Sequence, residues 1–143
     1  MSRFLEDLLS AEKRAIDGKL CLHSKKEPPQ IVFNDLVQNA KQAKDFEQMI
    51  LKRKDAKVVG VVEHCFSGMR FKIRLESDSC YIAFNLLGVR TLSSDKNQPA
   101  LAEFANDALT FAEEHLFQRE VHLEIFSCDK RGSFYGTIQT PSK

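Results

Sequence analysis

Three cations alternate along one stretch of the chain. Apolar residues separate Arg70, Lys72 and Arg74, so in an extended strand their side chains share one face. Guanidinium and ammonium groups in such a row can bind the phosphates of a nucleic-acid backbone. Lys130 and Arg131 stand in a predicted hairpin turn, so several cations could converge. The alternative is a solvated face whose cations pair with acidic side chains.

Other titratable side chains form no pattern typical of a catalytic or metal site. The four histidines fall on different predicted elements, without the close spacing of metal ligands. Glu113 and Glu114 are adjacent on a predicted helix, where neighbouring side chains diverge. The four cysteines form no CxxC pair and are interpreted as reduced packing residues. We therefore expect no catalytic residue, no metal and no cofactor.

The bulk composition favours one intracellular domain with extra elements. The chain has 143 residues, 43% of them hydrophobic, which suffices for one core. Lys and Arg number 21 against 20 Asp and Glu, so any basic surface must be local. Neither a signal peptide nor a membrane-spanning run is recognisable. The sequence predicts a soluble chain of the cytosol or nucleus that does not associate with membranes.

Two helices are predicted before the cation-rich stretch. Apolar residues recur at helical spacing over Arg3 to Asp17, and Gly18 follows as an expected cap. The stretch from Leu20 to Asn34 contains two prolines and is predicted to be an extended connection. Asn34 or Asp35 could cap a second helix that runs to about Lys52. Its expected apolar face is Leu36, Ala40, Ala43, Phe46, Met49 and Ile50.

The remainder predicts three strands, a helix and two strands. Alternating or continuous apolar runs give strands near 58–62, 69–75, 80–89, 121–126 and 134–138. The helix spans Pro99 to Phe117, and its apolar stripe is Leu101, Phe104, Ala105, Ala108, Phe111, Ala112 and Leu116. This order predicts an α+β fold: a five-stranded OB-fold barrel with a helix between strands three and four, preceded by N-terminal helices.

Several segments resemble the staphylococcal nuclease family. They are Val61-Val62-Glu63, Phe66-Ser67-Gly68, Phe84 to Val89, Phe104 to Phe111 and Asp129-Lys130. Three more resemble the Tudor staphylococcal nucleases, multidomain eukaryotic proteins with tandem nuclease-like repeats and a C-terminal Tudor domain. They are Leu9-Ser10-Ala11-Glu12, Leu22-His23-Ser24-Lys25-Lys26-Glu27 and Gln118-Arg119-Glu120-Val121.

This resemblance implies a division of the chain. Residues 1–56 would be a helical and linker segment, in which 3–17 resemble the closing helix of a preceding repeat. Residues 57–143 would be a nuclease-like OB-fold repeat, the third by its resemblance, lacking its trailing helices. Without those helices the barrel would expose apolar surface. We expect the N-terminal helix, or its copy from a neighbouring chain, to cover that surface.

The resemblance also implies a degenerate nuclease site. The family is associated with calcium-dependent nuclease activity, but Met69 replaces the second Asp of its Asp-Gly-Asp hairpin. Asn85 and Ser133 stand at its two arginine positions. Arg90 and Ser93 stand at the first and last positions of its Asp-Thr-Pro-Glu motif, and Arg90 would lie near the old pocket. The carboxylate ligands and the carboxylate base of the family are thus absent from these positions, and calcium affinity should be lost.

The resulting functional hypothesis is a noncatalytic RNA-binding repeat of a transcriptional coactivator and RNA-silencing or RNA-processing factor. Double-stranded or structured RNA would be held by backbone contacts, with Phe126, Phe134 or Tyr135 stacking on bases if exposed. Adjacent repeats and the Tudor domain are implied partners, and the implied location is the cytoplasm and nucleus. The alternative is a protein-interaction or scaffold module that recruits transcription or splicing factors, and a nuclease shared between repeats is a third possibility.

Overall fold

The computed structural model describes residues 4–27, 30–53, 57–91 and 99–141. The chain divides into two compact units, residues 1–31 and 32–143. The first unit holds the helix α1 (Leu5–Asp17) and the short 3-10 helix η1 (Cys21–His23). The N–H of Leu20 donates to the carbonyl of Ala15 at 2.9 Å, which closes the C-terminus of α1.

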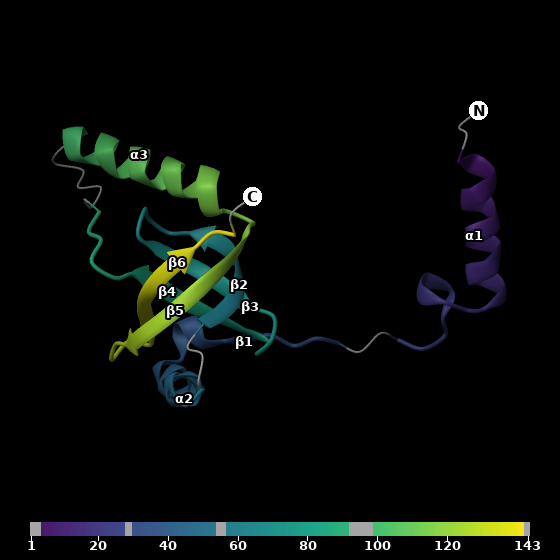
Figure 1. The fold of residues 1–143 in the computed structure, drawn as a ribbon, viewed down its shortest axis with the longest axis horizontal. Helices are drawn as coiled ribbons and strands as arrows, with labels where there is room; N and C mark the ends of the chain where they lie inside the picture. The colour runs from purple at the N-terminus through teal and green to yellow at the C-terminus, as the bar shows by residue number, and fades with distance from the viewer. Residues whose placement is uncertain (1–3, 28–29, 54–56, 92–98, 142–143) are drawn as a thin grey trace. The chain divides into compact units, whose positions relative to one another are not determined.

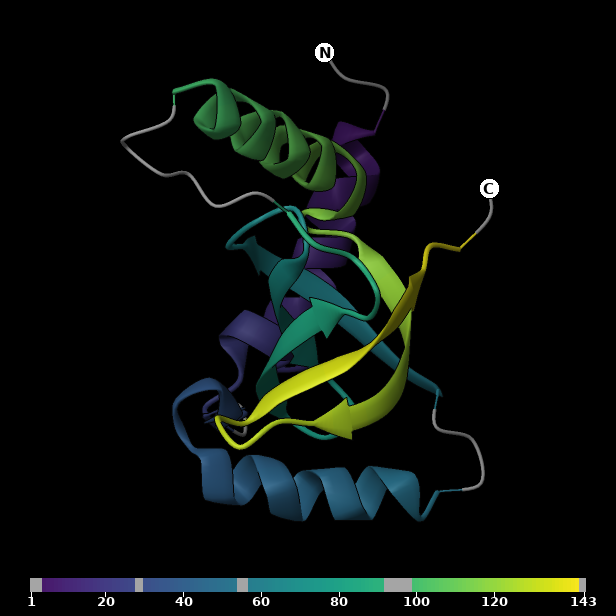
Figure 2. The same cartoon turned by 90° about the vertical axis from the view of Figure 1, so that its left-hand side faces the viewer.

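The second unit is built on a closed barrel (Figures 1 and 2). Its strands are β2 (Lys57–Cys65), β3 (Arg70–Leu75), β4 (Cys80–Leu86), β5 (Glu120–Cys128) and β6 (Ser133–Gln139). Neighbours in the order β4-β3-β2-β5-β6 are antiparallel, and a parallel β4–β6 pairing closes the barrel. The helix α3 (Pro99–Leu116) connects β4 to β5. The predicted α+β class, with a five-stranded barrel and a helix between its third and fourth strands, is confirmed.

The start of the second predicted helix is wrong. A two-residue strand, β1 (Asn34–Asp35), pairs in parallel with β4 where an extended connection was expected. The Asp35 side chain accepts from Val37 N–H at 3.0 Å and caps the 3-10 helix η2 (Leu36–Gln38). The helix α2 (Ala40–Leu51) begins later, where the Asn39 side chain accepts from Gln42 N–H. Asp35, one of the two predicted caps, thus belongs to the 3-10 helix, and the α-helix has its own cap in Asn39.

Helix α2 lies across one end of the barrel and belongs to its core (Figure 2). Ala43, Phe46 and Ile50 are buried, whereas Met49 is exposed, contrary to the predicted apolar face. The Glu47 carboxylate accepts from the N–H of Cys128, at the end of β5, at 2.7 Å. The compact unit thus begins before Lys57, the expected start of the repeat. The expected coverage of a barrel by α1 stays a prediction.

Helix α3 lies near the other end of the barrel (Figure 2) and packs with small side chains. A Cβ added to Gly68 would come within 2.9 Å of the Ala108 Cβ, so this turn requires glycine for α3 to approach. Ala112 is buried, but Phe104 and Phe111 are 63% and 64% exposed. The predicted apolar stripe is therefore only partly a core face. No helix among the described residues is long and apolar enough to cross a membrane.

Candidate functional site

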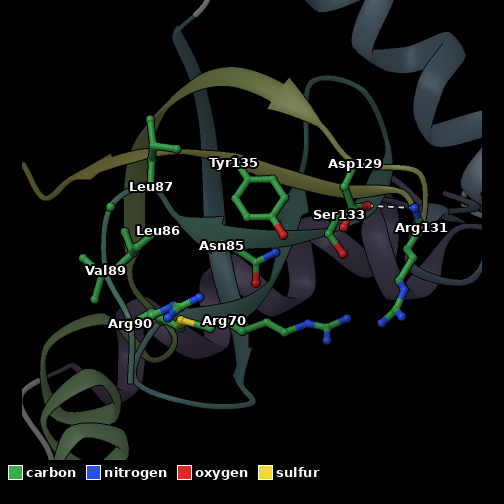
Figure 3. A pocket seen from close by; sticks show the side chains of 12 residues that line it. Arg70, Asn85, Leu86, Leu87, Val89, Arg90, Asp129, Arg131, Ser133 and Tyr135 are labelled. Atoms are coloured by element: carbon green, nitrogen blue, oxygen red, sulfur yellow. Dashed lines mark hydrogen bonds between the residues drawn. The ribbon is translucent and has the colours of Figure 1, made fainter. Parts of the chain in front are cut away.

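A pocket of about 640 Å³ lies where the end of β4 meets the β5–β6 turn (Figure 3). Its walls come from the start of β3, the segment 85–90 and the hairpin between β5 and β6. Four of the positions expected to carry a degenerate nuclease site line it, namely Met69, Asn85, Arg90 and Ser133. The fifth, Ser93, lies outside the described residues.

Strand pairing places the side chains at the pocket floor. Asn85 is in register with Arg70 on β3 and with Tyr135 on β6. The N–H of Leu86 donates to the Met69 carbonyl at 2.9 Å, and that of Leu87 donates to the Gly136 carbonyl at 2.8 Å. Because these backbone groups are already hydrogen-bonded to one another, the polar groups left to face the pocket are those of side chains.

Two buried polar side chains point into this space. Asn85 and Ser133 are 7% and 6% exposed, and Figure 3 shows the amide of Asn85 and the hydroxyls of Ser133 and Tyr135 facing one another across the floor. Among the described residues, no hydrogen bond joins the Asn85 amide or the Ser133 hydroxyl to another group, yet neither contributes an enclosed polar atom without a partner. Their polar atoms therefore reach the open space of the pocket, where a ligand or water can bond to them.

The β5–β6 turn is fixed by Asp129. Its Oδ1 accepts the backbone N–H groups of Arg131 and Ser133, each at 2.8 Å, and Gly132 takes a positive φ of 86°. This turn brings Arg131 to the pocket. Sequence reasoning missed Asp129 as a lining residue, although an Asp three positions before a Gly is a recognisable turn signal.

Three of the six predicted phosphate-binding cations line the pocket. They are Arg70, Arg90 and Arg131. None forms an ion pair with a carboxylate that the structure describes, although the Arg70 guanidinium lies 5.7 Å from the centroid of the Phe66 ring. Asp129 is the one carboxylate among the lining residues. The lining therefore carries an excess of two positive charges.

The two other cations of β3 are engaged elsewhere. Lys72 Nζ lies 3.1 Å from Asp35 Oδ2 and 4.6 Å from the Tyr81 ring centroid. Arg74 pairs with Glu63 at 2.9 Å and with Glu76 at 3.0 Å. The remaining candidate, Lys130, is exposed beside Arg131 and does not line the pocket.

The predicted aromatic platforms differ in access. Phe134 is fully buried, and its ring lies edge-on to Phe46 with centroids 6.0 Å apart, so it does not meet the condition of exposure on which stacking on bases depended. Phe126 is 49% exposed but does not line the pocket. Tyr135 is half-buried and lines it, so of the three it is the ring placed to contact a ligand there.

Thiols and metal ligands add no further chemistry to this site. Burial raises the pKa of Cys80 to about 12 and that of Cys128 to about 11, so both are neutral thiols at pH 7. In the ranges 4–27, 30–53, 57–91 and 99–141, no group of three His, Cys, Asp or Glu side chains is placed to hold a metal ion. The site therefore offers guanidinium, amide and hydroxyl donors.

The chain is similar to known nuclease-like proteins. Residues 83–143 match the family model described as Staphylococcal nuclease homologue. The chain is 35% identical over 138 residues to Ribonuclease TUDOR 1 of Arabidopsis thaliana, an alignment covering 96% of this chain and 13% of that protein. It is 32% identical over 136 residues to Staphylococcal nuclease domain-containing protein 1 of Drosophila melanogaster, covering 90% and 14% respectively. The chain thus spans less than a sixth of these relatives' lengths.

Proposed function

Because the chain contains a staphylococcal-nuclease-like domain homologous to the Tudor staphylococcal nucleases, we propose that this domain binds RNA without cleaving it. One observation carries the proposal. Arg70, Arg90 and Arg131 surround a single pocket, and none is neutralised by a described carboxylate. Guanidinium groups without a carboxylate partner bind phosphate oxygens well, because no ion pair has to be broken first.

The residue types argue against nuclease chemistry in this domain. A calcium site is normally built around several carboxylates, whereas this pocket offers one carboxylate, the neutral oxygens of Asn85, Ser133 and Tyr135, and the Met69 thioether. That carboxylate, Asp129, already accepts two backbone N–H groups through Oδ1. Arg90 would also repel a cation. The lining residues therefore do not fit calcium.

The same proposal includes the parent protein, the neighbouring domains and the cellular location, all suggested by the homology. The domain would be one repeat, the third by its resemblance, of a transcriptional coactivator that also acts in RNA silencing or processing. Its neighbours would be other nuclease-like repeats and a Tudor domain, in the cytoplasm and nucleus. The RNA would be double-stranded or structured and held by its backbone.

Fluorescence anisotropy of labelled double-stranded and single-stranded RNA tests the proposal. A salt series with and without calcium separates electrostatic binding from metal-dependent binding. Binding that weakens with salt, ignores calcium and leaves the RNA intact would support it. No binding at low salt would overturn it, and calcium-dependent cleavage would show that a nuclease site survives.

A protein-interaction role is the second candidate, and α3 favours it. Phe104 and Phe111 are exposed two turns apart on this helix. The helix carries four acidic residues and neither Lys nor Arg, so its surface would suit a basic, apolar segment of a transcription or splicing factor. If RNA binding fails, replacing both phenylalanines by Ser should weaken binding of such a segment. An unchanged affinity would exclude this face.

A further inference from the structure

The pocket is richer in hydrogen-bond donors than a phosphodiester requires. Its donors come from six side chains: Arg70, Arg90, Arg131, Asn85, Ser133 and Tyr135. In Figure 3 the three guanidinium groups lie along one side, and the amide and the two hydroxyls converge on the floor. A phosphodiester offers two non-bridging oxygens, whereas a phosphomonoester offers three strong acceptor oxygens.

The net charge of the pocket also favours a phosphomonoester over a phosphodiester. Three guanidinium groups and one carboxylate leave an excess of two positive charges. A phosphomonoester carries about −1.5 to −2 at pH 7, while a diester carries roughly half of that. The monoester therefore balances the lining more completely. Asn85 and Ser133 add donors without adding charge.

The shape of the pocket restricts how a phosphate can enter. Its floor is the hydrogen-bonded register of β4 and β6 at Asn85 and Tyr135, so a strand cannot thread through it. An internal phosphate has chain on both sides, whereas a terminal phosphate has chain on one side only. Leu87 and Val89 are half-exposed on the wall and can contact the adjoining sugar or base.

We propose that this pocket binds the terminal phosphomonoester of an RNA strand, an inference that rests on the proposed RNA-binding function. The guanidinium groups of Arg70, Arg90 and Arg131 hold the charged oxygens. The Asn85 amide and the Ser133 hydroxyl donate the remaining hydrogen bonds at the floor. The domain thereby distinguishes phosphorylated RNA ends from hydroxyl ends without a metal ion.

The test compares RNAs of one sequence that differ only at their ends. Each carries an internal fluorophore and a 5′-phosphate, a 3′-phosphate or hydroxyls at both ends, and binding to the whole chain is measured by anisotropy in EDTA. We expect at least one phosphorylated RNA to bind about tenfold more tightly than the hydroxyl-ended RNA. Asn85→Leu and Arg131→Ala should each remove this preference. Lys130→Ala is the matched control, because Lys130 neighbours Arg131 outside the pocket.

The outcomes separate this inference from the proposed function. Equal binding of all three RNAs would overturn the phosphomonoester site and leave RNA binding intact. Binding of none would overturn both. A preference that survives in both Asn85→Leu and Arg131→Ala would place the end-binding site elsewhere. Uridine 5′-monophosphate is the competitor, and an affinity equal to that of phosphorylated RNA would indicate a site for free nucleotides instead.

Discussion

The pocket and the outer face of β3 carry the same kinds of cations in opposite situations. Arg70 lines the pocket and pairs with no described carboxylate, whereas Arg74, four residues later, contacts both Glu63 and Glu76. Lys72 is held by Asp35 from β1. Neutralised cations contribute little to long-range attraction of phosphate. The partners of a cation, more than its position in a basic run, therefore decide whether it can bind RNA.

The largest effect expected from this comparison is on RNA affinity. Replacing Arg70 and Arg131 together by Ala should weaken binding about 100-fold at moderate salt and lower the salt slope by about two, because two phosphate contacts are lost. Anisotropy across a salt series measures both quantities. An unchanged slope would mean that these guanidinium groups do not contact phosphate.

The double variant Lys72→Ala/Arg74→Ala should have the opposite pattern, with a loss of stability and little change in RNA affinity. RNA affinity should change by less than about twofold, because these cations already pair with carboxylates. The free energy of unfolding should instead fall by about 1–2 kcal/mol, since Asp35 and Glu63 lose partners and the ring contacts of the two cations disappear. Urea denaturation provides the check. A large loss of RNA affinity with unchanged stability would show that the paired cations of β3 bind RNA, contrary to this prediction.

Arg53 extends the comparison to a third paired cation. Its guanidinium donates to Asp78 at 2.6 and 3.3 Å, and this hydrogen bonding holds the pKa of Asp78 below its ordinary value of 3.8. The pair therefore stabilises the fold above that value, and its contribution is lost as pH falls through the lowered pKa. Arg53→Met should reduce stability at pH 7 by about 1 kcal/mol and flatten its decline below about pH 4. Identical acid unfolding curves for the two proteins would contradict this.

Calcium should have the smallest effect. Because the pocket has a single carboxylate and three arginines, millimolar calcium should shift the melting temperature by less than about 1 °C. Magnesium at equal ionic strength is the control. A rise of several degrees specific to calcium would show that a metal site persists.

Local patterns were sufficient to predict much of the fold. Apolar alternation placed Phe71, Ile73 and Leu75 in the core, and all three are fully buried. Helix α3 was predicted almost to the residue, because its apolar spacing is regular. The start of α2 was wrong because Asp35 and Asn39 each provide a cap, and local sequence did not show that Asp35 belongs to a separate 3-10 helix.

The site could be predicted only in part, because pairing depends on distant residues. The contact between Lys72 and Asp35 spans 37 positions and exists because β1 pairs with β4. Arg74 meets Glu63 because β2 and β3 are neighbours in the barrel. The unpartnered state of Asn85 is likewise a property of the assembled pocket. The sequence pattern identified the cations but could not distinguish those that pair with a carboxylate from those that do not.

The most direct test follows the arginine side chains themselves. Two-dimensional NMR of the Nε–Hε groups, recorded during titration with RNA in EDTA, reports on each guanidinium separately. Signals of Arg70, Arg90 and Arg131 should shift on binding, while those of Arg53 and Arg74 should stay in place. Shifts of Arg74 with unmoved Arg131 would contradict this prediction and move the RNA-binding surface to the outer face of β3.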